Sequence, residues 1–77
     1  MTLKKFKSKI KRKSEEELII ILATLNRDYY LSLRYMYANP FPPHPEEDRK
    51  YINILERKIV YVNTIIQQHL SQQNTLN

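Results

Sequence analysis

The 77-residue sequence predicts a single all-α domain, with two long helices in an antiparallel hairpin and a basic arm at the N-terminus. Apolar residues recur at helical spacing in two long segments, about residues 14–39 and 45–72. A proline-rich corner at residues 40–44 separates the two segments, and most of the basic residues precede the first of them. Residues 73–77 are polar and are expected to fray.

The predicted arm, residues 1–13, contains seven lysines and arginines and no acidic residue. The remaining chain contains six basic and eight acidic residues, so the formal charge of +5 divides into +7 on the arm and −2 elsewhere. A basic cluster gains affinity for a polyanion by releasing counterions, which favours a nucleic acid as the partner. The arm is also weakly amphipathic, through Leu3, Phe6 and Ile10. A solvated tail, an anionic membrane surface and a trimmed organelle transit peptide therefore stay as alternatives.

The first helix is predicted to begin at Ser14, whose hydroxyl can accept from the amide of Glu17 while the Glu17 carboxylate reaches back. It should end near Asn39, because Pro40 disfavours helical geometry in the residue before it. Its apolar face is formed by Leu18, Leu22, Leu25, Tyr29, Leu33 and Met36.

The second helix is predicted to begin at Pro45, followed by acidic residues that favour a helix N-terminus. Its apolar stripe is Ile52, Leu55, Ile59, Val62 and Ile66, followed by His69 or Leu70. The two helices have similar lengths and a short connection, which predicts an antiparallel pair.

Two helices cannot enclose all the apolar residues of this chain. The residues without a place in the predicted hairpin are Ile20, Leu31, Ile54, Val60 and Ile65. We expect these side chains to be covered either by a second copy, in a four-helix bundle, or by a larger body.

Composition excludes several classes of function. The chain has no cysteine and no glycine, which excludes disulfides, thiolate metal sites and glycine-dependent phosphate loops. The longest apolar run, from Leu18 to Ala23, is too short to span a membrane. His44 and His69 are interpreted as a loop residue and a partly buried or terminal residue, not as metal ligands. We therefore expect no enzyme activity, cofactor, metal or small-molecule substrate. The six tyrosines are expected to serve packing or partner contacts more than base stacking.

Three motifs occur in a distinctive order: Lys13-Ser14-Glu15-Glu16-Glu17-Leu18, Leu33-Arg34-Tyr35 and Arg57-Lys58-Ile59-Val60-Tyr61-Val62-Asn63-Thr64. Together they resemble the family of ribosomal protein twenty-nine of the large subunit, over about residues 5–70. Tyr35 stands for a phenylalanine of the family pattern. Glu56, Tyr61 and Asn63 stand where that pattern is often basic, so the second helix is less cationic than is usual in the family.

The resemblance implies a structural protein that binds large-subunit rRNA near the peptide exit tunnel, beside ribosomal protein twenty-three. The proline-bearing corner resembles that of mitochondrial members, which implies a mitochondrial ribosome, with plastid or bacterial cytoplasmic ribosomes as alternatives. Charge and resemblance together predict ten RNA-binding residues: Lys4, Lys5, Lys7, Lys9, Lys11, Arg12, Lys13, Arg34, Arg57 and Lys58.

The main alternative is a small dimeric regulator or inhibitor, a four-helix bundle that binds DNA or a host protein. It accounts for the apolar stripes and the basic arm equally well. It does not account for the three ordered motifs.

Overall fold

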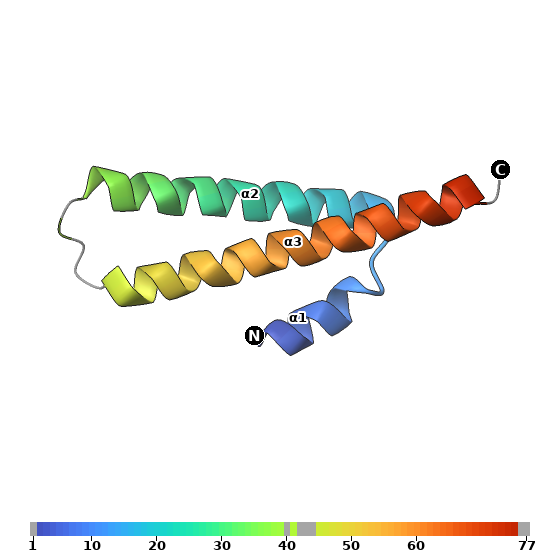
Figure 1. Ribbon diagram of the computed structural model, residues 1–77, viewed down its shortest axis with the longest axis horizontal. Coiled ribbons are helices and arrows are strands. Elements are labelled where there is room, and N and C mark those ends of the chain that lie inside the picture. The colour runs from blue at the N-terminus through green and yellow to red at the C-terminus, as the bar shows by residue number, and fades with distance from the viewer. Residues whose placement is uncertain (1, 40, 42–44, 76–77) are drawn as a thin grey trace.

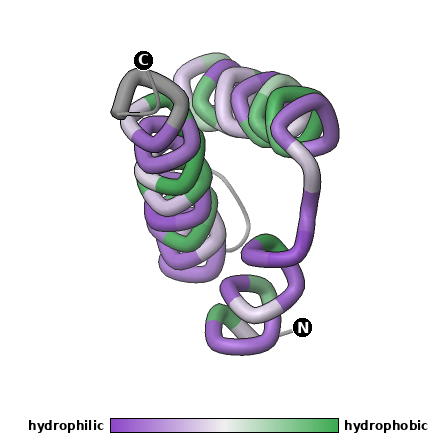
Figure 2. Tube along the Cα trace, turned by 90° about the vertical axis from the view of Figure 1, so that its right-hand side faces the viewer, coloured by the Kyte–Doolittle hydropathy of each residue, from purple (hydrophilic) through white to green (hydrophobic). Residues whose placement is uncertain are grey.

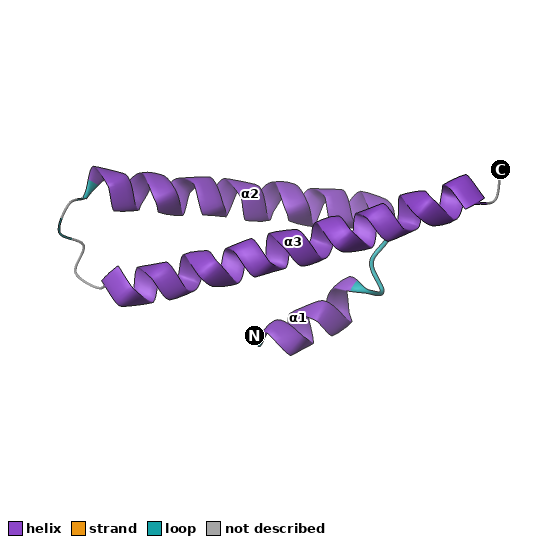
Figure 3. Ribbon diagram, viewed as in Figure 1, coloured by secondary structure: helices purple, strands orange, loops and turns teal. Residues whose placement is uncertain are grey.

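The computed structural model describes residues 2–39, 41 and 45–75. This part of the chain forms three helices, α1 (Leu3–Ile10), α2 (Glu15–Ala38) and α3 (Pro45–Thr75), as Figure 1 shows. No strand occurs in these residues (Figure 3), so the predicted all-α class is confirmed.

The long helices α2 and α3 lie side by side, and the chain runs along them in opposite directions (Figure 1). The boundary of α2 follows local chemistry: Ser14 is its N-cap, and Asn39 leaves the helix with extended backbone angles, as expected for a residue before proline. Helix α3 begins at Pro45 and continues to Thr75, past the predicted end near residue 72. Residues 40 and 42–44 of the predicted corner, including His44, lie outside the described residues, as do residues 76–77 of the predicted tail.

The segment predicted as a basic arm is part of the folded body, because residues 3–10 form a helix with a buried apolar face. Thr2 caps α1 by accepting from the Lys5 amide at 3.2 Å. Phe6 and Ile10 are buried, with exposed fractions of 9% and 2%, and Leu3 is half-buried. Each large apolar side chain removed from water contributes roughly 1.5–3 kcal/mol. This gain explains why so cationic a segment packs against the rest of the molecule.

The hydrophobic core lies where α1, α2 and α3 meet. It contains the fully buried Ile10, Leu18 and Val62, together with Phe6, Leu25, Leu55 and Ile65. Helix α1 packs mainly on α3, and the view along the molecule shows α1 and α2 as separate neighbours of α3 (Figure 2). The expectation that Ile65 lacks cover within the chain is wrong, because its side chain is only 7% exposed and belongs to this core.

The other surplus apolar residues remain at the surface. The exposed fractions of Ile20, Leu31, Ile54 and Val60 range from 44% to 66%. Helix α1 has eight residues and a length of about 12 Å, so it covers only part of α3, whose 31 residues extend about 46 Å.

Replacing Ile10 with alanine tests whether α1 belongs to the fold. Because Ile10 is fully buried, Ile10→Ala should lower the free energy of unfolding by about 2–4 kcal/mol. Urea denaturation followed by circular dichroism measures this change. Tyr37→Ala is the control, because Tyr37 is 87% exposed on α2 and its loss should change stability by less than about 0.5 kcal/mol. Equal stabilities for the two variants would contradict the packing of α1.

Candidate nucleic-acid interface

Seven of the ten predicted RNA-binding residues lie on α1 and the turn that follows it. Helical spacing places the four cations of α1 on opposite flanks of the buried apolar face, Lys4 and Lys7 on one and Lys5 and Lys9 on the other. One hollow beside α1 is lined by Lys4, Lys7 and Lys11, and another by Lys9, Arg12 and Lys13. All of these cations except the half-buried Lys13 are exposed, and so is Lys5. The structure therefore displays the basic charge along a fixed helix.

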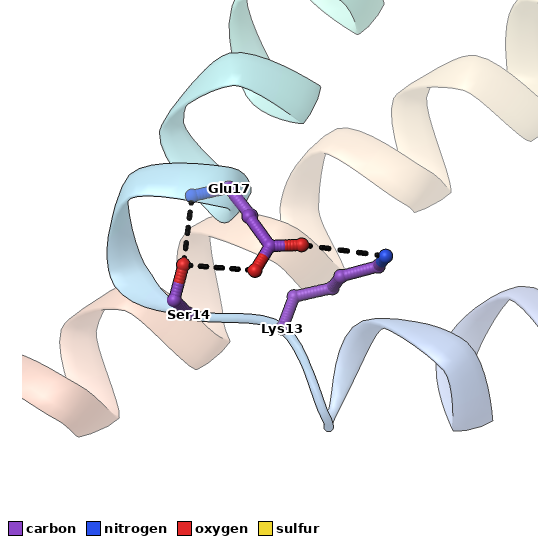
Figure 4. A network of polar contacts seen from close by, with 3 residues as sticks. All are labelled: Lys13, Ser14 and Glu17. Atoms are coloured by element: carbon purple, nitrogen blue, oxygen red, sulfur yellow. Dashed lines mark hydrogen bonds and ion pairs between the residues drawn. The ribbon is translucent and has the colours of Figure 1, made fainter.

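Lys13 belongs to a polar network at the joint between α1 and α2 (Figure 4). Its Nζ lies 3.4 Å from Glu17 Oε2, and the Ser14 hydroxyl donates to Glu17 Oε1 at 3.1 Å. The Glu17 amide in turn donates to Ser14 Oγ at 3.2 Å, as the sequence predicts. The hydrogen bond from the Ser14 side chain, followed by that from Lys13, holds the pKa of Glu17 below its ordinary value. Lys13 is thus already paired with a carboxylate within the chain.

Two cation–π contacts join α1 to α3 in a reciprocal way. Lys58 Nζ of α3 lies 5.0 Å from the centre of the Phe6 ring, and Lys7 Nζ of α1 lies 5.1 Å from the centre of the Tyr61 ring. Such contacts are worth roughly 0.5–1 kcal/mol each at exposed sites. Lys58 is half-buried, so this predicted phosphate contact also holds α1 in place.

An open groove runs between α1 and α3, and it brings predicted cations from both helices together. Leu3 and Lys7 line it from α1, and Arg57, Val60, Tyr61 and Thr64 line it from α3. Arg57 is exposed, so its side chain is accessible in the groove that Lys7 also lines. The structure thus joins Arg57 to the basic surface of α1.

Arg34 is not part of this surface. It lies on α2, where its guanidinium is 5.9 Å from the centre of the Tyr30 ring. Both side chains are exposed, which leaves Arg34 accessible but apart from the α1–α3 groove.

Glu56 has an internal role that the sequence did not indicate. Tyr29 of α2 donates to Glu56 Oε1 of α3 at 2.8 Å, and this hydrogen bond is the main reason that the pKa of Tyr29 lies above its ordinary value. Glu56 also lines the α1–α3 groove. The acid at this position therefore joins the two long helices.

Sequence reasoning missed Phe6 and Tyr61 as residues that shape the candidate interface. The spacing of Leu3, Phe6 and Ile10 carried the signal for the first of them, because steps of three and four residues define one helical face. Tyr61 gave no comparable signal, since its position depends on where α1 packs.

Other kinds of site were sought in the described part of the chain. It contains no group of three or more histidines, cysteines or acidic residues that could hold a metal ion. None of its helices combines the length and apolar character needed to cross a membrane. Comparison with protein-family models, curated proteins and solved structures finds no match to this chain.

The Glu17 network predicts a loss of stability in acid. Because folding lowers the pKa of Glu17, its stabilising contribution is complete above the ordinary value of 4.5 and is lost as the pH falls through the lower folded-state value. Glu17→Gln should therefore unfold with a weaker dependence on pH below about 4.5 than the unchanged chain, as measured by urea denaturation at several pH values.

Two controls support this experiment. Ser14→Ala removes the cap and should cost about 1 kcal/mol near neutral pH. Glu16→Gln removes a neighbouring exposed charge and should leave most of the acid dependence in place. If Glu16→Gln and Glu17→Gln give the same pH profile, the network does not set the pKa of Glu17.

Proposed function

We propose that this chain is a structural component of a large ribosomal subunit, where it binds rRNA through α1 and the adjoining part of α3. The observation that carries the proposal is the fixed display of cations on α1, next to Arg57 of α3. Counterion release from phosphates supplies most of the affinity of such a surface. Lysines act on phosphates as point charges, and an arginine can bind two phosphate oxygens at once. Contacts of this kind position a protein on RNA without reading its sequence.

The ribosomal setting is supported by the three ordered motifs and their resemblance to the ribosomal protein twenty-nine family. In this proposal α2 and α3 form the antiparallel hairpin of that family, and α1 provides its basic arm in folded form. The resemblance also places the chain near the peptide exit tunnel, beside ribosomal protein twenty-three. It favours a mitochondrial ribosome through the proline-bearing corner. The exposed apolar residues of α2 and α3 would then contact rRNA or neighbouring proteins.

The packing of α1 argues against binding to a membrane surface. On a membrane surface, α1 would need the apolar face that Phe6 and Ile10 bury in the core. The cations of α1 remain exposed in the folded chain, as binding to RNA requires.

Co-sedimentation tests the ribosomal proposal directly. The native protein should sediment with large ribosomal subunits and dissociate as the salt concentration rises, because phosphate contacts are screened. The purified chain should bind a large-subunit rRNA fragment with a logarithmic affinity that falls linearly with the logarithm of salt concentration. Recovery as a free dimer without rRNA affinity would favour the regulator. Binding to anionic vesicles without rRNA affinity would favour the membrane surface.

Substitutions at neighbouring positions of α3 test the orientation of the interface. Arg57→Glu should weaken rRNA binding by about 1.5–3 kcal/mol, because it replaces a charge-assisted phosphate contact with repulsion. Glu56→Gln keeps an oxygen that can accept from Tyr29 and removes a negative charge from the groove, so it should bind rRNA at least as tightly. Filter binding at fixed salt measures both effects.

Tyr29→Phe is the matched control for Glu56→Gln. It removes the hydrogen bond between α2 and α3 without changing the charge, so it should affect stability more than rRNA affinity. Normal binding by Arg57→Glu would show that this part of α3 does not face RNA.

A further inference from the structure

We infer that the groove between α1 and α3 is a composite site for an RNA backbone phosphate, complete only while α1 is packed on α3. The inference rests on the proposed function and adds to it. It assigns one phosphate to a defined pair of cations, Lys7 and Arg57. It also makes RNA affinity depend on the burial of Phe6 and Ile10 of α1.

The groove offers two cations from two different helices. Lys7 Nζ is held above the Tyr61 ring, 5.1 Å from its centre, and the exposed Arg57 lines the same groove. Thr64 also lines the groove, but its hydroxyl already donates to the Val60 carbonyl at 2.9 Å. An anion in the groove would therefore be bound by the ammonium and guanidinium groups.

Tyr61 positions Lys7 and does not itself bind the phosphate. Its hydroxyl oxygen is buried and has no hydrogen-bond partner within the described part of the chain. An atom so covered is not accessible to a ligand in the groove. The ring instead provides a face that attracts the Lys7 ammonium group and keeps it on the side of α3 that carries Arg57.

The position of Lys7 depends on the burial of its neighbour Phe6. Phe6 is 9% exposed and lies under Lys58 Nζ of α3 at 5.0 Å, while Ile10 fixes the other end of α1. A helix of eight residues is not stable alone in water, because nucleation is costly. Without its contact to α3, the segment would lose its helical rows of lysines and the juxtaposition of Lys7 with Arg57.

Binding and packing must then assist each other. RNA should bind the chain more tightly when α1 is packed on α3 than when it is not. Bound RNA then shifts the packing equilibrium of α1 by the same factor by which packing raises the RNA affinity, because coupling between two equilibria is reciprocal. Glu56 lines the same groove and would repel a phosphate, yet its Oε1 accepts from Tyr29. The Glu56 carboxylate therefore contributes to the contact between α2 and α3, although its charge opposes phosphate binding.

The first test disrupts the packing of α1 without changing its charge. Phe6→Ser in the full chain should bind a short duplex RNA about tenfold more weakly at fixed salt, because the seven cations lose their fixed arrangement. Circular dichroism should show that the long helices remain. Tyr61→Phe is the control: it keeps the ring beneath Lys7 and removes a buried, unpaired hydroxyl, so RNA affinity should stay the same and stability should not fall.

The second test compares two exposed lysines of α1, and amide hydrogen exchange must show that α1 stays packed when Lys7→Gln removes the contact with Tyr61. Lys7→Gln and Lys9→Gln each remove one exposed charge from α1, but only Lys7 lines the groove beside Arg57. Lys7→Gln should weaken binding by about tenfold and Lys9→Gln by about twofold. The losses from Lys7→Gln and Arg57→Gln should also be non-additive, because both residues contact one phosphate.

The outcomes separate this inference from the proposed function. Equal losses for Lys7→Gln and Lys9→Gln, or full affinity in a Phe6→Ser chain whose α1 is shown by amide hydrogen exchange to be unpacked, would overturn the composite site. Salt-dependent RNA binding would in that case still support the proposed function. Absence of salt-dependent RNA binding by the unchanged chain would overturn both.

Discussion

The burial of Phe6 and Ile10 against α3 is the interaction on which the rest of this structure depends. The two long helices alone leave the side of α3 around Lys58 and Tyr61 open. The apolar face of α1 closes that side and completes the core around Leu18 and Val62. The entropy lost in ordering this short segment must be offset by this apolar burial, since α1 packs mainly against one helix.

The same packing determines which cations remain accessible to a partner. Lys58, over Phe6, and Lys13, beside Glu17, are both half-buried, whereas Lys7 stays exposed although it lies over Tyr61. Lys7 and Arg57 are left on the open groove, and Lys4 and Lys11 flank Lys7 on the same side of α1. A cationic surface that is ordered before binding loses less conformational entropy on association than a disordered tail does. In the proposed function, the core packing of α1 and its affinity for RNA are therefore two effects of one contact.

The starts of the two long helices could be predicted from sequence, because they depend on residues close together in the chain. The packing of the helices could not, because it depends on residues far apart. The start of α2 depends on Ser14 and Glu17, whose interactions span one helical turn, and the pattern found it correctly. The packing of α1 depends on three apolar residues within a segment dominated by charge, so the composition predicted a basic arm and not a helix of the core. The burial of Ile65 and the hydrogen bond from Tyr29 to Glu56 were not foreseen, because both depend on contacts between residues far apart in the sequence.

Two surfaces of the molecule remain open to partners: the basic groove between α1 and α3, and a hollow between α2 and α3 at one end. Helix α1 covers α3 near Lys58 and Tyr61. It does not reach the region where Leu31 and Tyr35 of α2 lie beside Tyr51 of α3. These three side chains are each about half exposed and line a hollow at the end of the molecule where α2 ends and α3 begins. Apolar patches of this kind commonly mark interaction sites. In the proposed function, rRNA would occupy the basic groove and a neighbouring chain would cover this apolar patch.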